Sequence, residues 1–178
     1  MTAERSKKKG IIKMKLRITA LIIASLTFLT LICSCGDKPA SYKNDIPVAD
    51  LKAAAEAKLS NTDTFVELDS DYIEYMMELD SSAFTEGIVR WQASGISADE
   101  YGIFKASTEE DAAALAELLK DYLKKRDETW NPSYDADQYP KLQNAEVKVM
   151  GQYAVFCILS DSDRAAVFTA VENALLGK

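Results

Sequence analysis

The hydrophobic positions of this chain alternate between helical and strand-like spacing. Apolar side chains recur every three or four residues in four segments, which predicts helices over 48–59, 71–79, 108–125 and 161–176. Alternating apolar runs between them predict two antiparallel hairpins, 88–93 with 101–106 and 146–150 with 152–159. We therefore expect an α+β domain in which the helices pack on a sheet of about four strands.

Two parts of this pattern resemble each other. Residues 101–113 and 153–165 each combine a strand, a capped helix start and a helix, and their Tyr, Phe, Asp and Ala positions match in step. The match suggests a duplicated ββα unit. A generic strand-cap-helix pattern would produce the same similarity, so both interpretations stay open.

The first 35 residues have a different pattern. Six Lys and Arg residues between Lys7 and Arg17 precede an uncharged stretch of 17 residues from Ile18 to Ser34. This length lies between a signal-peptide core of ~7–15 residues and a membrane span of ~20 residues. A cleaved signal over 1–34 is the prediction and an uncleaved anchor helix is the alternative. The true start could be Met1 or Met14.

The stretch ends in Leu-Ile-Cys-Ser-Cys, with an apolar residue three positions before Cys35 and a small residue just before it. This arrangement resembles the lipobox of bacterial lipoprotein precursors, whose cysteine is diacylated and becomes the mature N-terminus. The resemblance implies lipidation at Cys35 and a location on the extracytoplasmic face of the cell membrane. Residues 35–45 then form a polar tether, and 46–178 form a single α+β domain.

Charge is unevenly divided between these parts. The chain has 21 Lys and Arg and 28 Asp and Glu, and residues 1–35 hold seven of the basic residues and one of the acidic ones. The mature part therefore has 14 basic and 27 acidic residues, a net charge of −13. Such a domain repels phosphate backbones and anionic headgroups, so we expect no nucleic acid partner. A basic envelope protein would suit it, and the lipid must supply the membrane attachment.

The residue types present exclude several chemistries. The chain has no histidine, which rules out a Ser-His-Asp triad, a Cys-His pair and zinc sites with imidazole ligands. Cys157 is the only cysteine after Cys35, and its apolar surroundings predict a buried hydrophobe. The carboxylates near Asp69 and Asp161 are explained as helix caps rather than as calcium ligands. We expect no cofactor, no metal and no catalytic residue.

Three residues of the first hairpin are candidate ligand contacts. Glu100 begins a predicted strand, Tyr101 follows it, and Trp91 lies on the strand before. Glu100 could contact a ligand or act as a general acid. A structural role, as a strand-end cap or as the partner of Arg90, is the alternative. Trp91, Trp130, Tyr134 and Tyr139 also suggest stacking on a glycan, although aromatic side chains beside strands are more often core.

Two stretches resemble the signature segments of a known family. Residues 97–106 and 144–153 are similar to those of domain of unknown function 4358 (DUF4358), and a long helix that ends near Arg126 lies between them. A Tyr- and Pro-containing segment at 134–140 follows this helix, and the resemblance covers roughly 46–160. It implies a small lipoprotein from a Gram-positive, clostridial-type bacterium. The family carries no established activity, so no catalytic residue is transferred.

Taken together, these features predict a lipid-anchored extracytoplasmic binding or assembly module without catalysis. The alternative is a cell-envelope hydrolase that uses carboxylates such as Glu100. It requires a second carboxylate at ~5–9 Å in a shared pocket. The oligomeric state and the ligand stay open.

Overall fold

The computed structural model describes residues 41–60, 62–93, 96–133 and 135–178. The predicted signal peptide, Cys35 and Tyr134 lie outside the described residues. Residues 41–178 form one compact unit. Within the described ranges, no helix combines the length and the apolar character that crossing a bilayer requires.

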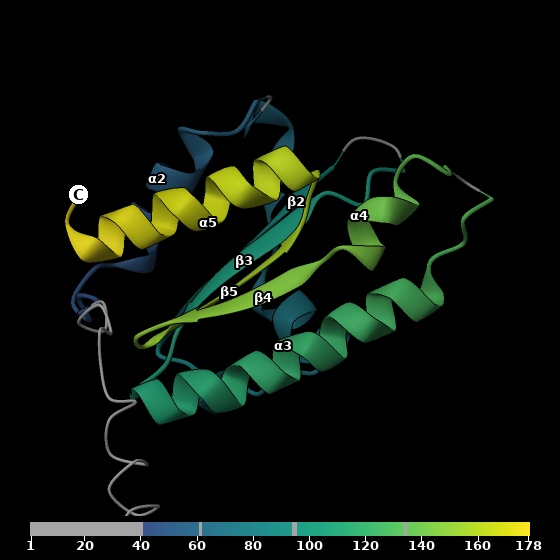
Figure 1. Cartoon of the computed structure of the whole chain (residues 1–178). Helices are drawn as coiled ribbons and strands as arrows, with labels where there is room; N and C mark the ends of the chain where they lie inside the picture. Colours follow the sequence, from purple (N-terminus) through teal and green to yellow (C-terminus); the bar gives the residue numbers. More distant parts are fainter. Residues whose placement is uncertain (1–40, 61, 94–95, 134) are drawn as a thin grey trace, which may run out of the picture. The chain divides into compact units, whose positions relative to one another are not determined.

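The centre of the unit is an antiparallel sheet of five strands in the order β1-β2-β3-β5-β4 (Figure 1). Both predicted hairpins are confirmed. One pairs β2 (Glu86–Gln92) with β3 (Glu100–Lys105), and the other pairs β4 (Glu146–Met150) with β5 (Tyr153–Ile158). The hairpins join through β3 and β5, where Ile103 lies opposite Val155. The α+β class is therefore confirmed, with one strand more than expected.

The additional strand is β1 (Phe65–Glu67), which follows a 3₁₀ turn, η1 (Thr62–Thr64). It pairs with the outer side of β2, and Val66 lies opposite Trp91. Three residues are too few to show an alternating pattern, which is why the sequence does not reveal this strand.

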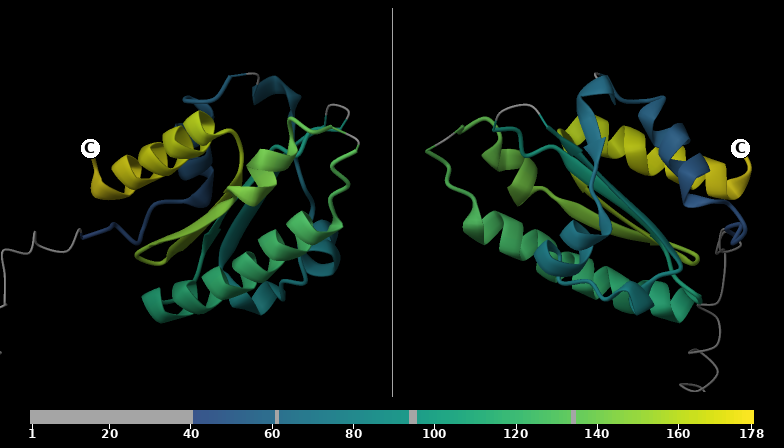
Figure 2. Two further views of the ribbon diagram at one scale, coloured as in Figure 1. Left: turned by 45° about the vertical axis from the view of Figure 1, so that its right-hand side comes forward. Right: turned by 180° about the vertical axis from the view of Figure 1, so that it is seen from behind.

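Helices cover both faces of the sheet (Figures 1 and 2). One face carries α2 (Val48–Glu56) and α5 (Asp161–Leu176), which pack on each other and on the strands. The other carries α3 (Glu109–Thr129) and α4 (Tyr139–Gln143). A π-helical turn, η2 (Tyr72–Met76), and a 3₁₀ turn, η3 (Ser81–Ala83), contribute to the same face.

Side chains alternate between these two cores along the central strands. Tyr101 and Tyr153 face α2 and α5, whereas Phe104 and Phe156 face α3. Strands β3 and β5 are buried along almost their whole length, as expected when helices lie on both faces of a sheet.

The helix limits differ modestly from the predictions. Helix α5 has the predicted bounds, α2 ends at Glu56 rather than 59, and α3 continues to Thr129 rather than 125. The helix predicted over 71–79 is instead the short η2 turn, followed by Glu78 with a φ of 58°.

The repeated strand-cap-helix stretches are similar only in part. Thr108 caps α3 by accepting the Asp111 backbone N–H, and Ser160 caps α5 by accepting that of Asp163. However, Tyr101 and Tyr153 face the same side of the sheet, while α3 and α5 lie on opposite sides. The structural repetition therefore stops where the helices begin.

Candidate functional site

Glu100 is the only charged residue buried in the core of the described residues, with 0% of its surface exposed. As the first residue of β3 it lies opposite Trp91 and faces α3. Tyr122 donates a hydrogen bond to its Oε1 at 2.6 Å, and Arg126 Nη2 lies 3.2 Å from its Oε2 in an ion pair. Both carboxylate oxygens therefore face partners from one helix.

The alternative in which Glu100 pairs with Arg90 is wrong. Successive strand residues point to opposite faces, so Arg90 and Tyr101 lie on the side of α2. There Arg90 Nε donates to Glu56 Oε1 at 2.8 Å, and the Tyr101 hydroxyl donates to the same oxygen at 3.2 Å. The sheet thus separates Tyr101 from Glu100, and the three predicted contacts do not form one site.

Burial dominates the electrostatics of the Glu100 network. It raises the pKa of Glu100, while the Arg126 charge and the Tyr122 hydrogen bond oppose that rise. Burial also raises the pKa of Tyr122, and the neighbouring Glu100 raises it further. Tyr122 therefore stays a hydrogen-bond donor well above its ordinary titration range.

The end of α3 around this network is incompletely hydrogen-bonded. Within the described residues, Glu100 Oε2, Arg126 Nε, Asp127 Oδ1 and Trp130 Nε1 are buried without a hydrogen-bond partner. Glu100 Oε2 retains its ion pair with Arg126. The other three atoms, on Arg126, Asp127 and Trp130, have lost water without gaining a hydrogen bond. They therefore reduce the contribution of this part of the core to the free energy of unfolding.

The network continues to the segment 68–85, which we call the strap. The hydroxyl groups of Tyr72 and Tyr122 lie 3.1 Å apart, so Tyr72 links the start of η2 to Glu100 through Tyr122. A second tie is the ion pair between Glu78 and Lys125, at 2.6 Å. Glu100 is thus connected to the strap through Tyr122.

A surface groove of about 330 Å³ runs along the strap beside β1 and β2. Its apolar lining consists of buried or half-buried side chains, namely Leu68, Ile73, Leu79 and Phe84. Two exposed acidic residues, Asp69 and Glu74, line it as well, whereas Glu67 Oε2 lies 3.5 Å from Lys52 Nζ of α2, on the other face of the sheet. The groove therefore combines an apolar lining with negative charge.

The outer side of the strap exposes large apolar side chains. Tyr75 is 70% exposed and Met76 is 57% exposed, and Leu118 on α3 is 43% exposed. Leu118 lines a smaller pocket together with Met77 and Glu78 of the strap. Aromatic and Met side chains are enriched in protein interfaces.

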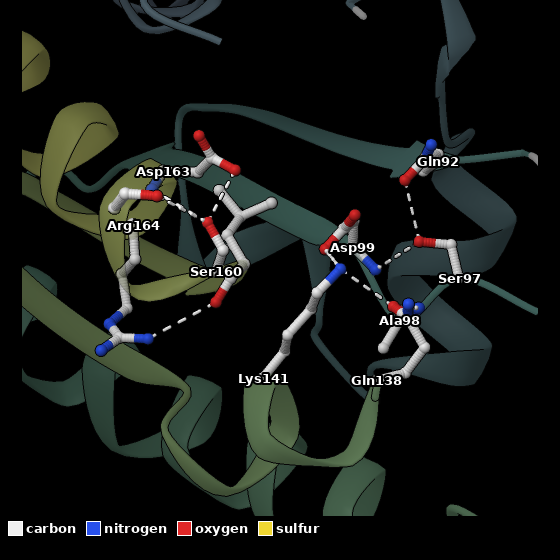
Figure 3. Close-up of polar contacts among 11 residues, drawn as sticks. Gln92, Ser97, Ala98, Asp99, Gln138, Lys141, Ser160, Asp163 and Arg164 are labelled. Carbon is white, nitrogen blue, oxygen red and sulfur yellow. Dashed lines mark hydrogen bonds and ion pairs between the residues drawn. The ribbon is translucent and has the colours of Figure 1, made fainter. Parts of the chain in front are cut away.

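A second polar cluster lies where α4 meets the end of the first hairpin (Figure 3). Lys141 lies on α4 and Gln138 directly precedes this helix, and Lys141 Nζ lies 2.6 Å from Asp99 Oδ1. Gln138 Oε1 accepts the Ala98 backbone N–H, and Ser97 donates to Gln92. The named groups bond to one another, so this cluster fastens α4 to the sheet.

The remaining candidates have structural roles. Cys157 lies fully buried in β5, where burial raises the pKa of its thiol, as expected for a buried hydrophobe. Asp69 Oδ1 accepts the Tyr72 backbone N–H, which confirms a capping role near η2. In the part of the chain that the structure describes, no three His, Cys, Asp or Glu side chains gather in a way that could hold a metal ion.

The sequence contained one unused signal for the network. Leu115, Leu119, Tyr122 and Arg126 follow one stripe of α3 at helical spacing. An Arg on a buried stripe requires a nearby carboxylate, because an unpaired buried charge is costly. That reasoning points from Arg126 to an acid in the facing strand, whereas the groove depends on tertiary contacts that no local pattern shows.

The fold defines an α+β domain whose α3 face carries the strap. The chain belongs to the family described as domain of unknown function 4358 (DUF4358), whose sequence profile matches residues 57–159, more than half of the chain. No curated protein and no solved structure matches it. The matched range includes the groove and the Glu100 network but neither α2 nor α5.

Proposed function

We propose that this protein is a lipid-anchored, extracytoplasmic module of a Gram-positive bacterium that binds a basic envelope protein without catalysis. Cys35 supplies the anchor. The strap groove supplies the binding surface, and its combination of apolar lining and carboxylates is the observation that carries the proposal.

The groove matches the chemistry of a basic partner. Lys and Arg side chains place an aliphatic stem on apolar surface while their charged ends stay near water and carboxylates. Leu68 and Phe84 offer such a surface, and Asp69 and Glu74 offer the charge. The net charge of −13 after Cys35 would also accelerate the approach of a cationic partner.

Glu100 supports binding rather than hydrolysis. A general acid must reach the substrate, but Glu100 is enclosed and faces Tyr122 and Arg126. Its hydrogen bond to Tyr122 instead holds Tyr72 and thereby the strap. We assign it a positioning role for the groove.

Photo-crosslinking in the producing cells tests the proposal. A photoreactive phenylalanine analogue replaces Tyr75 on the strap or, as the control, Thr169 on the outer side of α5, which is also exposed. We expect a crosslink to a basic protein from position 75 and none to that protein from position 169. The double variant Asp69→Asn/Glu74→Gln should weaken the crosslink because it removes negative charge from the groove, while an Asn oxygen at position 69 can still accept the Tyr72 backbone N–H.

Equal crosslinking from both positions would contradict the proposal, because it would show no preference for the strap. So would a position-75 crosslink that only an acidic or neutral protein forms. An unchanged crosslink in the double variant would show that the carboxylates do not contribute.

A further inference from the structure

The residues that follow the predicted tether are tied to one end of the domain. Lys43 donates its backbone N–H to the Leu175 carbonyl at 2.9 Å. The Tyr42 hydroxyl donates to Glu172 at 3.1 Å, and the Tyr153 hydroxyl donates to the Ile46 carbonyl at 2.6 Å. We call residues 42–46 the clamp. Part of the segment that the sequence assigns to the tether therefore contacts the domain.

The clamp provides a hydrogen-bond donor for a backbone carbonyl at the end of α5. The last four carbonyls of a helix have no intrahelical partner, and the Leu175 carbonyl in the last turn of α5 is one of them. Lys43 caps it, and its ammonium group lies close to Gly177, where a cation suits the negative end of the helix.

The turn between β4 and β5 completes this contact. Gly151 has a φ of +60°, and a Cβ placed there would lie 2.9 Å from Asn44 Oδ1 and 3.0 Å from Tyr42 Cβ. Both the backbone conformation and the close approach of the clamp require glycine. The clamp thus fits against the end of α5 and a turn shaped to receive it.

This contact lies at one end of the domain formed by residues 41–178. The β4–β5 turn at Gly151 lies beside the end of β3, because Tyr153 pairs with Lys105 and the Ala106 backbone N–H donates to the Gln152 carbonyl. Helix α3 begins at Glu109, four residues after β3 ends, and runs away from this end (Figure 2). Its 21 residues span about 31 Å, so the end of α3 and α4 lie at the opposite end of the domain.

We propose that the clamp fixes which end of the domain faces the membrane. This inference depends on the lipid anchor of the proposed function. Residues 36–41 separate Cys35 from Tyr42, and the seven steps between these two residues reach at most about 23–25 Å. The clamp end must therefore stay near the bilayer. The net charge of −13 disfavours a domain that lies flat on anionic headgroups, so α3 extends outward.

Energy transfer to the bilayer tests this orientation. Glu109→Cys and Glu128→Cys are a matched pair, because both are exposed Glu residues on α3 about 28 Å apart along its axis. The lipid-modified protein carries a donor dye at one position and is reconstituted in phosphatidylcholine and phosphatidylglycerol vesicles that contain an acceptor lipid. Cys157 is buried, which restricts labelling to the introduced cysteine.

We expect several-fold stronger transfer from position 109 than from position 128. Equal transfer, or stronger transfer from 128, would overturn the orientation. A flexible Gly-Ser insertion of about 20 residues after Lys38 adds ~25 Å of reach. It should reduce the difference between the two positions, and an unchanged difference would show that the short tether is not its cause.

The lipid anchor is assessed separately. Cys35→Ala should lose labelling by a fatty-acid analogue and should no longer bind the vesicles. If the unmodified sequence also lacks the label or fails to bind, the anchor itself is refuted. If it binds and the two positions transfer equally, only the clamp inference fails.

Discussion

Glu100 and Arg126 show how one buried charge constrains its surroundings. Removing one partner of a buried ion pair costs ~3–5 kcal/mol, because the other charge stays desolvated and unpaired. The Arg126 side chain is 24% exposed and its Nε lacks a hydrogen bond, which places this pair at the lower end of that range. Arg126→Leu should therefore lower the free energy of unfolding by about 3 kcal/mol in urea denaturation.

A nearby cation provides the control for this variant. Lys124 lies on the same helix, is 73% exposed and lies 3.8 Å from Glu128. Lys124→Leu should change the free energy of unfolding by less than about 1 kcal/mol. The double variant Glu100→Gln/Arg126→Leu should cost less than Arg126→Leu alone, since no buried charge remains. Equal costs for Arg126→Leu and Lys124→Leu would contradict the importance of the pair.

Tyr122 makes stability depend on pH in the alkaline range. Its pKa in the folded state is raised by burial and by Glu100 above the ordinary value near 10. Above pH 10 the unfolded state loses the proton while the folded state keeps it. The free energy of unfolding should then fall by about 1.4 kcal/mol per pH unit for this residue, and below pH 10 the contribution is fully present.

Tyr122→Phe isolates this contribution. The variant lacks the hydrogen bond to Glu100 and should be less stable at pH 8, but its stability should decline less steeply between pH 10 and about 11. Urea denaturation at each pH measures both slopes. The same alkaline slope in the variant would show that Tyr122 ionises normally in the folded protein.

At the scale of the elements, local signals predicted most of the fold. The apolar runs 146–150 and 152–159 predicted the β4–β5 hairpin, and helical spacing over 108–125 and 161–176 predicted α3 and α5. These features succeed because hydrogen bonds within a few residues determine them.

Elements that depend on distant contacts were not predictable in the same way. The helix predicted over 71–79 is replaced by a short π-helical turn, with Asp69 accepting the Tyr72 N–H at its start. Periodicity indicates which side of a helix is buried but not which face of the sheet it covers. The division of α3 and α5 between opposite faces therefore required the structure.

In the candidate site, too, the sequence predicted what depends on local pattern and missed what depends on distant contacts. Glu100 was identified from its position at the start of a strand, but its partner lies 26 positions further along the chain, on α3. The groove combines residues from Glu67 to Gly87, and their arrangement depends on how Tyr72 and Glu78 attach the strap to α3. The sequence alone could therefore identify Glu100 but not the groove along the strap.

For the whole molecule, the family match separates the domain into two parts. The profile covers the sheet and the α3 face, while α2, α5 and the clamp lie outside residues 57–159. Yet α2 and α5 bury one entire face of the sheet, including Tyr101 and Tyr153. A fragment limited to the matched residues would expose this apolar face, so the compact unit must extend further in both directions.

The N-terminal limit of this unit leads to a prediction about stability. Residues 42–44 make one backbone hydrogen bond to α5, from Lys43. They also contribute the partly buried ring of Tyr42, which packs on the core between the sheet and helices α2 and α5. A backbone hydrogen bond contributes ~0.5–1.5 kcal/mol, and partial burial of the ring adds about 1 kcal/mol. The free energy of unfolding of a chain that starts at Asp45 should therefore be about 1–3 kcal/mol lower than that of a chain that starts at Ser41.

Urea denaturation of the two chains measures the difference. Identical midpoints and slopes would mean that the clamp contacts the domain without stabilising it, which would also weaken the case that it orients the domain at the membrane.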